Sequence, residues 1–310
     1  MSTVQGPGGV APPANVDRSD RSMATASTDP SGTDAAPKRR PDTKHQVAPP
    51  VPRWLFVPAV LGFLLLLMPL VALLVRADWA AFPSAITSEA SRQALWLSIR
   101  CGIIAVIICL VLGVPLALVM ARNEGGWVRL VRALCTLPLV LPPLVGGIAL
   151  LFLLGRNGLL GRYLDLWFGI RIPFTTAAVV IAQSFVALPF LVVSVEGALR
   201  TAGTRYDVVA STLGAGRWTV FRRVTLPLVG PGLLSGTVLC FARALGEFGA
   251  TALFAGNAPG VTRTMPLAIY TLFNGGGAGQ DAAIAMSLLL VLVAVVFLLL
   301  IRGWRGEASA

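Results

Sequence analysis

Two charged residues, Arg243 and Glu247, lie four positions apart in a stretch of small and apolar residues. Residues at this spacing share one face of an α-helix, so their side chains could form an ion pair. Small residues allow helices to approach closely, which would bury the charged face inside a helix bundle. The small neighbours are Ala242, Ala244, Gly246, Gly249 and Ala250. Three roles stay open for the pair: a structural link, a gate that exchanges partners, or direct contact of Arg243 with an anion.

Residues that serve most enzymes are scarce in this sequence. The one histidine, His45, and both lysines, Lys38 and Lys44, lie within the first 50 residues. A Ser-His-Asp triad, a metal cluster or a P-loop lysine is therefore not expected in the rest of the chain. The cysteines stand singly in apolar stretches and are expected to act as small hydrophobic residues: Cys101, Cys109, Cys135 and Cys240. We expect no catalytic residue, no metal site and no cofactor of the chain's own.

The elements that position Arg243 and Glu247 are predicted to be membrane-spanning helices. Hydrophobic residues make up 55% of the chain and charged residues 13%, and the mean hydropathy is +0.78. Apolar runs long enough to cross a hydrocarbon layer of about 30 Å recur, and lipid-embedded backbone satisfies its polar groups as helix. We therefore predict an all-α fold with six spans, namely Trp54–Val75, Ala94–Met120, Val128–Leu154, Thr175–Leu199, Leu228–Phe254 and Asp281–Ile301. Prolines in or beside the spans predict kinks, not span ends: Pro69, Pro115, Pro138, Pro142, Pro143, Pro189 and Pro231.

The positions of the basic residues predict the orientation of these spans. A net charge of +11 could indicate nucleic-acid binding. With a cytoplasmic N-terminus, however, most basic residues fall on the cytoplasmic side, as the positive-inside rule requires. Those on the outer side are Arg76, Arg92, Arg156, Arg162, Arg171 and Arg263. We therefore predict that both termini are cytoplasmic, that the protein is a multi-pass protein of the cell membrane in contact with lipid, and that it does not bind nucleic acid.

The first 50 residues differ in composition from the rest of the chain. They are rich in Pro, Ser, Thr, Ala and Gly and contain no apolar run, so they cannot bury enough surface to fold alone. An apolar core typical of a signal peptide is missing near the start. We predict a disordered cytoplasmic tail over residues 1–50 and a transmembrane domain over residues 51–305.

The segment 200–227 is the longest predicted cytoplasmic connection after the tail. Its pattern predicts a short helix flanked by bends, with Gly214 and Gly216 at the break. Trp218 and Phe221 form an apolar ridge at helical spacing. It also holds five arginines: Arg200, Arg205, Arg217, Arg222 and Arg223. The segment could dock into a groove of another protein, or its arginines could simply follow the positive-inside rule.

The order of residues in this segment resembles the E-A-A-x3-G-x9-I-x-L-P loop of ABC importer permeases. Ala210, Gly214 and the sequence Val224-x-Leu226-Pro227 match it. Val208 and Val209 replace the first Glu and Ala, which leaves Asp207 as the nearest acid. The resemblance implies that this coupling segment docks on a separate ATP-binding subunit. It assigns the coupling role to Asp207, Val208, Ala210, Gly214, Arg217, Leu226 and Pro227.

Two further stretches resemble molybdate permease subunits of the same importer class. They are "LPLVLPPLVGGIALLFLLGRNGLLGRYLD", Leu137 to Asp165, and "FARALGEFGATALFAGNAPGVTRTMPLAIY", Phe241 to Tyr270. The resemblance implies a homodimer that imports molybdate with two cytoplasmic ATPase subunits and an extracytoplasmic molybdate-binding protein. It also implies that ATP is bound and hydrolysed by the partner subunit. Sulfate permeases are similar in these stretches, so tungstate, sulfate or thiosulfate are alternative substrates.

Two other classes of membrane protein compete with this interpretation. An ATP-independent channel or secondary transporter would use intramembrane charges for coupling ions, but it has no use for the loop from Gly214 to Pro227. A scaffold without transport activity would not need Arg243 and Glu247 inside a span, because burying charges there is costly. Both classes are disfavoured by the residues they leave unexplained.

Overall fold

The computed structural model describes residues 52–275 and 279–307. The chain divides into two compact units, Met1–Leu55 and Phe56–Ala310. In the first unit only residues 52–55 are described, and they contain the short 3-10 helix η1 (Arg53–Leu55). The predicted disordered tail, residues 1–50, lies outside the described residues.

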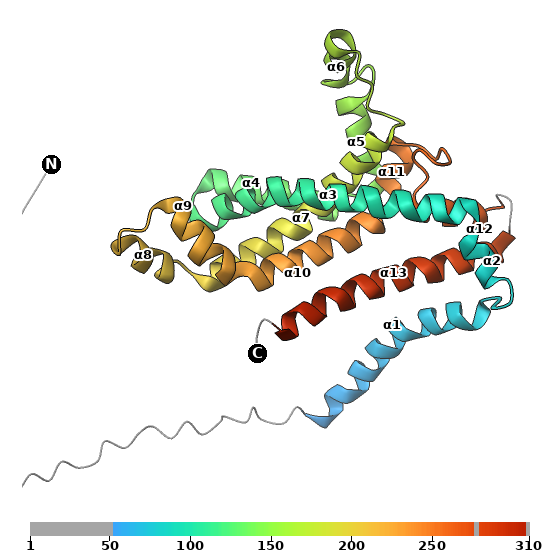
Figure 1. The fold of residues 1–310 in the computed structure, drawn as a ribbon, viewed down its shortest axis with the longest axis horizontal. Coiled ribbons are helices and arrows are strands. Elements are labelled where there is room, and N and C mark those ends of the chain that lie inside the picture. Colours follow the sequence, from blue (N-terminus) through green and yellow to red (C-terminus); the bar gives the residue numbers. More distant parts are fainter. Residues whose placement is uncertain (1–51, 276–278, 308–310) are drawn as a thin grey trace, which may run out of the picture. The chain divides into compact units, whose positions relative to one another are not determined.

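The second unit consists of helices and connecting loops, with no strand among the described residues, which confirms the predicted all-α class (Figure 1). The long helices are α1 (Phe56–Arg76), α3 (Glu89–Arg122), α4 (Gly126–Val140), α5 (Pro143–Leu154), α7 (Thr176–Ala202), α10 (Leu226–Leu245) and α13 (Gly279–Glu307). The short elements are α2 (Phe82–Thr87), α6 (Gly161–Phe168), α8 (Arg205–Thr212), α9 (Arg217–Val220), the π-helix η2 (Phe221–Thr225), α11 (Gly249–Phe254) and α12 (Met265–Phe273).

Five helical stretches in the described residues are long and apolar enough to cross a membrane. They are α1, α3, α7, the continuous stretch Arg217–Leu245, and α13 from Gly279 to Leu299. A sixth candidate is the pair α4 and α5, which is bent by 117° between the two helices. The predicted number of spans is therefore reached only if this bent pair counts as one.

The third predicted span, Val128–Leu154, is not the kinked helix that we expected. Leu141 and Pro142 are both extended, with ψ of 133°, and they separate α4 from α5. A residue that precedes proline is disfavoured in the helical region, and here Pro142 and Pro143 apply this restriction twice in succession. Single prolines stay inside helices as expected, at Pro69, Pro115, Pro138, Pro189 and Pro231. The correction thus concerns the double proline alone.

The fifth predicted span, Leu228–Phe254, is also broken. The helix begins earlier, at Arg217, and ends at Leu245, where Gly246 takes a φ of −86° and a ψ of 7°. A separate short helix, α11, follows from Gly249. The Glu247 carboxylate accepts a hydrogen bond from the Ala250 N–H at 2.8 Å, so it caps the new helix instead of continuing the old one.

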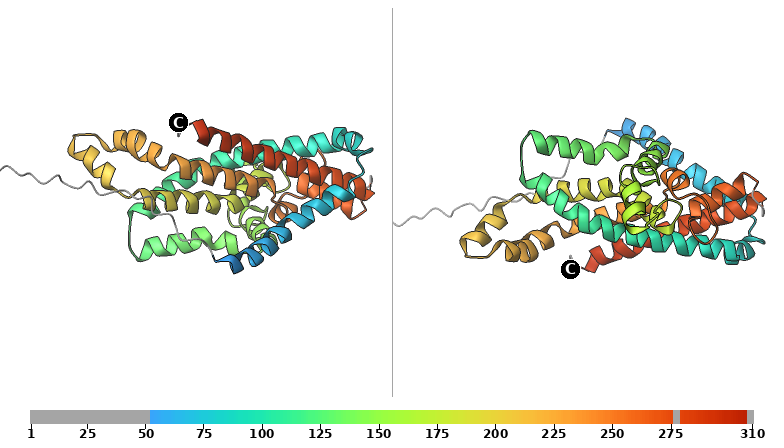
Figure 2. Two further views of the ribbon diagram at one scale, coloured as in Figure 1. Left: turned by 90° about the horizontal axis from the view of Figure 1, so that it is seen from below. Right: turned by 90° about the horizontal axis from the view of Figure 1, so that it is seen from above.

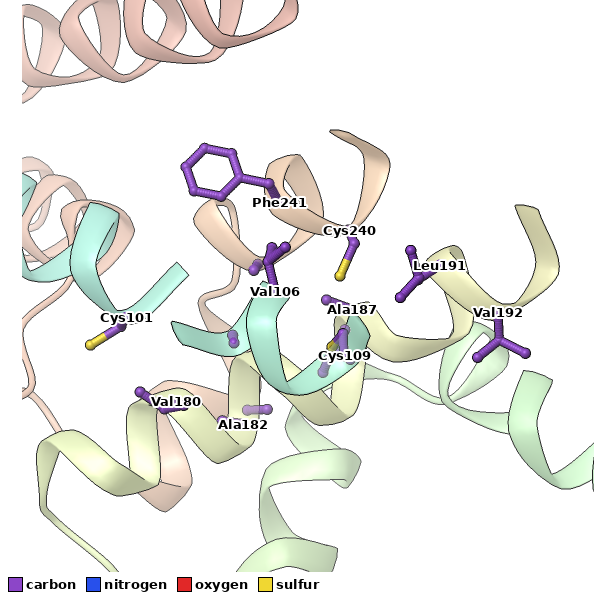
Figure 3. Close-up of a cluster of buried hydrophobic side chains, with 14 of the residues drawn as sticks. Cys101, Val106, Cys109, Val180, Ala182, Ala187, Leu191, Val192, Cys240 and Phe241 are labelled. Carbon is purple, nitrogen blue, oxygen red and sulfur yellow. The ribbon is translucent and has the colours of Figure 1, made fainter. Parts of the chain in front are cut away.

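The core forms where α3, α7 and α10 lie side by side (Figures 1 and 2). Small residues make this packing close: Gly232 of α10 lies directly against Ala198 of α7, where any Cβ would overlap the Ala198 methyl group. Figure 3 shows Cys109 of α3 and Cys240 of α10 pointing toward each other among apolar side chains. All four cysteines are free, and Cys109 and Cys240 are buried.

Helix α1 is packed differently from the rest of the second unit. None of its residues is buried, although nearly all of them are apolar. A helix that is hydrophobic on all sides requires a nonpolar environment, either lipid or another protein surface. Helix α1 therefore presents its apolar surface to lipid or to another protein and is not part of the core.

Candidate functional site

The coupling segment, residues 200–227, projects at one end of α7 and α10, opposite the end that carries α2 and α12 (Figure 1). Helix α8 lies between two glycines with positive φ, Gly203 at 65° and Gly214 at 84°. After α8 the Ala215 N–H bonds to the Ala210 carbonyl at 3.1 Å, which closes the helix end. A Cβ at Gly214 would meet no atom within 4 Å, so its backbone conformation, not space, requires glycine there. The predicted short helix flanked by bends is present.

The outer surface of the coupling segment is unusually apolar for a connection rich in arginine. Val208 and Val209 of α8 are more than half exposed, and Leu213 is 82% exposed. Trp218 is also exposed, and its ring lies 5.6 Å from that of Phe221. Exposed apolar groups that lie together on a surface are typical of a protein interaction site.

The other predicted coupling residues occupy distinct places around α8. Arg217 is exposed at the start of α9, and a pocket of about 570 Å³ beside it is lined by residues of both α8 and α9. Ala210 is half-buried on α8. Leu226 and Pro227 form the first turn of α10, directly after the π-helix η2.

Asp207 points inward from α8 and does not belong to the exposed apolar surface. Its Oδ2 atom pairs with Arg122 Nη2 at 2.5 Å, and its Oδ1 atom accepts a hydrogen bond from Thr225 Oγ1 at 2.8 Å. Arg122 also donates to Thr225 Oγ1 at 3.1 Å. These bonds join α8 to the last residue of α3 and to the π-helix η2. Asp207 therefore fixes the position of α8.

Arg243 and Glu247 do form an ion pair, but Glu247 lies just after the end of α10. Arg243 Nη1 is 2.8 Å from Glu247 Oε2, and Glu247 is 1% exposed. This contact lacks hydrogen-bond geometry, so Oε2 has no hydrogen-bond partner among the described residues. Glu247 Oε1 caps α11 through the Ala250 N–H. The pair thus joins α10 to α11. We call residues 243–251 the α10–α11 junction.

The bent pair of helices packs against this junction. A Cβ at Gly249 would lie 2.8 Å from Cβ of Pro143, the first residue of α5. A Cβ at Gly147 would lie 2.9 Å from the Ala250 carbonyl oxygen. Real Cβ atoms do not approach so closely, so both positions need glycine for α5 and α11 to touch. The break after Leu245 and the bend after Val140 are therefore parts of one packed arrangement.

Several buried polar groups were not predicted from the sequence. Gln183 on α7 is fully buried, and neither atom of its side-chain amide has a hydrogen-bond partner among the described residues. The same holds for the hydroxyl groups of Ser184 and Thr251. Glu196, also on α7, is 6% exposed and pairs with two arginines. A signal was available in the sequence, because an amide and a carboxylate inside a predicted membrane span are costly and usually functional.

Comparisons with known proteins agree with this architecture. Residues 113–305 match the model of a family described as "Binding-protein-dependent transport system inner membrane component". The Molybdenum transport system permease protein ModB of Mycobacterium tuberculosis is 56% identical over 249 residues, covering 80% of this chain and 93% of that protein. The protein of the same name from Escherichia coli K12 is 40% identical over 224 residues, covering 72% and 97%.

A solved structure shares the fold at low sequence identity. It is a bacterial alginate ABC transporter in complex with an alginate pentasaccharide-bound periplasmic protein. The TM-score is 0.66 at 18% identity, and the match covers 82% of this chain and 93% of that chain. This likeness concerns the fold alone.

Proposed function

This chain belongs to the family of binding-protein-dependent transport system inner membrane components, and we propose that it forms the molybdate path of an ATP-driven importer. We infer molybdate as the substrate from the 56% identity to a molybdenum permease across 93% of that protein's length. The chain is the permease subunit and not the ATPase. Its spans make it a multi-pass protein of the cytoplasmic membrane.

ATP hydrolysis is proposed to occur on two separate cytoplasmic subunits that dock on the coupling segment. The exposed apolar surface of α8, with Val208, Val209 and Leu213, suits such a contact. In this proposal the segment and both termini face the cytoplasm. Closure of the ATPases would draw two coupling segments together and move the packed helices as rigid bodies. The substrate would arrive on an extracytoplasmic molybdate-binding protein.

A second copy of the chain is proposed to complete the path. A symmetric pair would bury the same surface on each copy. The apolar α1, none of whose residues is buried in one chain, offers area for contact with a partner or with lipid. The α10–α11 junction and the bent α4–α5 pair would then supply the part of each copy where the path is opened and closed.

Molybdate is a tetrahedral dianion, so a transport path has to offer hydrogen-bond donors without binding it tightly. The Gln183 amide and the Thr251 hydroxyl, which are buried and have no hydrogen-bond partner in the described part of the chain, suit this need. The Arg243–Glu247 pair suits a gate, because a pair that exchanges partners never leaves either charge alone in a medium of low dielectric constant. Glu247 would repel a dianion, which weakens direct binding by Arg243.

The deciding test is uptake of labelled molybdate in cells that lack this chain and have no redundant importer. We expect uptake to be lost, and to return with the wild-type chain only when the ATPase subunit is also present. Competition by tungstate, sulfate and thiosulfate would rank the alternative substrates. Unchanged uptake without the chain would refute the proposal, and uptake that persists without the ATPase would favour a channel.

A further inference from the structure

A buried carboxylate near the C-terminal end of α7 connects this helix to α4. Glu196 Oε1 accepts a hydrogen bond from Arg132 Nε of α4 at 2.9 Å and another from Arg200 Nε of α7 at 2.9 Å. Arg132 Nη2 approaches the same oxygen to 2.7 Å. Glu196 is 6% exposed, so its side chain is enclosed by these arginines and by the helices that carry them. We call Glu196, Arg132 and Arg200 the Glu196 cluster.

The two arginines also satisfy the end of α3. The last four carbonyl groups of a helix have no partner within it and carry partial negative charge. The carbonyl of Met120, in the last turn of α3, accepts hydrogen bonds from Arg132 Nη2 and from Arg200 Nη2, both at 3.2 Å. Each guanidinium therefore connects Glu196 to the end of α3. The planar, forked donor group of arginine suits this double contact better than a lysine would.

The same turn of α3 is also attached to the coupling segment. Arg122, two residues after Met120, holds Asp207 of α8 and Thr225 of η2. The end of α3 is thus bonded on one side to α8 and on the other side to α4 and α7. Helix α4 leads through the bend into α5, which packs against the α10–α11 junction. A continuous set of contacts therefore runs from the coupling segment to the proposed gate.

We propose that Glu196 is a positioning residue that makes α4 move together with α3 and α7 when the coupling segment moves. This inference rests on the proposed function, because it assigns a path for movement inside the same permease. Glu196 acts through Arg132 and Arg200. Without its charge, two partly exposed arginines face each other at the end of α3, and α4 loses the anion that attaches it to α7. Movement of α8 would then be passed to α4 only in part, because Arg132 keeps its bond to the Met120 carbonyl but loses its bond to Glu196.

The test uses the complete transporter in lipid vesicles, with its ATPase and its molybdate-binding protein. Molybdate uptake and ATP hydrolysis are measured on the same vesicles, and their ratio is the quantity that decides. For Glu196→Gln and Arg132→Met we expect the amount of molybdate imported per ATP to fall about fivefold or more, the lower range of coupling between sites. Basal ATP hydrolysis should stay near the wild-type rate, because α8 keeps its own bonds to Arg122.

A matched control is available on α4. Arg129→Met removes a positive charge one turn before Arg132, at an exposed residue for which no ion pair is present among the described residues. It should leave the ratio unchanged. Arg132→Lys keeps the charge but not the forked donors, and we expect an intermediate ratio.

Other results would overturn the inference. A ratio that stays normal in Glu196→Gln would show that α4 does not depend on this carboxylate. Uptake and hydrolysis that fall in parallel with a lower melting temperature, or loss of assembly in both Glu196→Gln and Arg132→Met, would assign the cluster to folding alone. A wild-type complex that hydrolyses ATP but imports no oxyanion would refute the proposed function and, with it, this inference.

Discussion

The end of α3 and the α10–α11 junction both hold buried acidic groups, but they satisfy them differently. At the end of α3, Glu196 Oε1 accepts two hydrogen bonds, and Asp207 accepts one at each carboxylate oxygen. At the junction, Glu247 Oε2 has an ion pair without a hydrogen bond, and the Thr251 hydroxyl has no partner among the described residues.

This difference indicates two kinds of mechanical behaviour. A network in which each member is satisfied is rigid, because every displacement breaks several bonds at once. A site with unsatisfied polar groups loses less when it rearranges, and it can gain new partners in another arrangement. The end of α3 is therefore suited to transmit movement, and the junction is suited to change state. The following predictions test that contrast, from the largest expected effect to the smallest.

Charge reversal at the junction should have the largest effect. Arg243→Glu or Glu247→Arg leaves a buried charge opposed by a like charge, and breaking such a pair costs about 3–5 kcal/mol. Each single variant should lose molybdate uptake and melt at a lower temperature. The double swap should recover part of both, as measured by thermal unfolding and by uptake. Normal transport in both single variants would contradict both proposed roles of the pair, the gate and the structural link.

Loss of the charge on Asp207 should have a smaller effect. Asp207→Asn keeps a hydrogen-bond acceptor for Thr225 but loses the ion pair with Arg122, and hydrogen bonds to charged groups contribute about 1.5–3 kcal/mol. The value should lie at the low end because Arg122 is 41% exposed. Co-purification of the ATPase should fall several-fold while the bundle keeps its melting temperature. Glu124→Gln, at an exposed acid outside this network, should bind the ATPase normally.

Replacing Gly214 should disturb the coupling segment without touching any neighbour. Gly214→Val places a β-branched residue at a φ of 84°, where a side chain costs about 1–2 kcal/mol. Substrate-stimulated ATP hydrolysis should fall, with membrane insertion intact. The matched control is Gly216→Val, because Gly216 has a φ of −65° and equal space around it. Equal activities of the two variants would contradict a special role for the Gly214 backbone.

Replacing Gln183 should give the smallest change in stability, and the change tests whether its amide serves the anion path. Gln183→Leu removes a buried amide that has no hydrogen-bond partner within residues 52–275 and 279–307, which should stabilise the fold by about 1 kcal/mol. If the amide serves the anion path, uptake should fall although the melting temperature rises. A rise in melting temperature with unchanged uptake would place Gln183 outside the path. Unsatisfied polar groups would then matter for transport only at the α10–α11 junction.

The sequence predicted what depends on composition and local pattern. Apolar runs located the spans, because hydropathy reports burial in lipid directly. The coupling segment was predicted because Gly214 and Gly216 mark a break and because the spacing from Gly214 to Pro227 matches the permease loop. The pairing of Arg243 with Glu247 followed from their spacing, although Glu247 reaches Arg243 from beyond the helix.

Features that depend on tertiary contact were missed. Hydropathy cannot distinguish a straight span from the bent α4–α5 pair, because both halves are apolar. The break after Leu245 is equally hidden, since only the bond from Ala250 to Glu247 marks a new helix. Asp207 was predicted to couple to the ATPase as the acid nearest to the Glu position of the motif, yet its partner Arg122 lies 85 residues away in the sequence. Glu196 and Arg200 have helical spacing, but Arg132, which gives the cluster its meaning, comes from another helix.

The bend between α4 and α5 has a consequence for how the chain can sit in a bilayer. With 15 and 12 residues, the two helices are about 22 Å and about 18 Å long, so neither crosses a hydrocarbon layer of about 30 Å alone. Of the three corner residues, Pro142 and Pro143 have no N–H group, and the Leu141 N–H bonds to the Leu137 carbonyl at 3.1 Å. The three corner residues therefore carry no orphaned donor, which lowers the cost of turning within the oily layer.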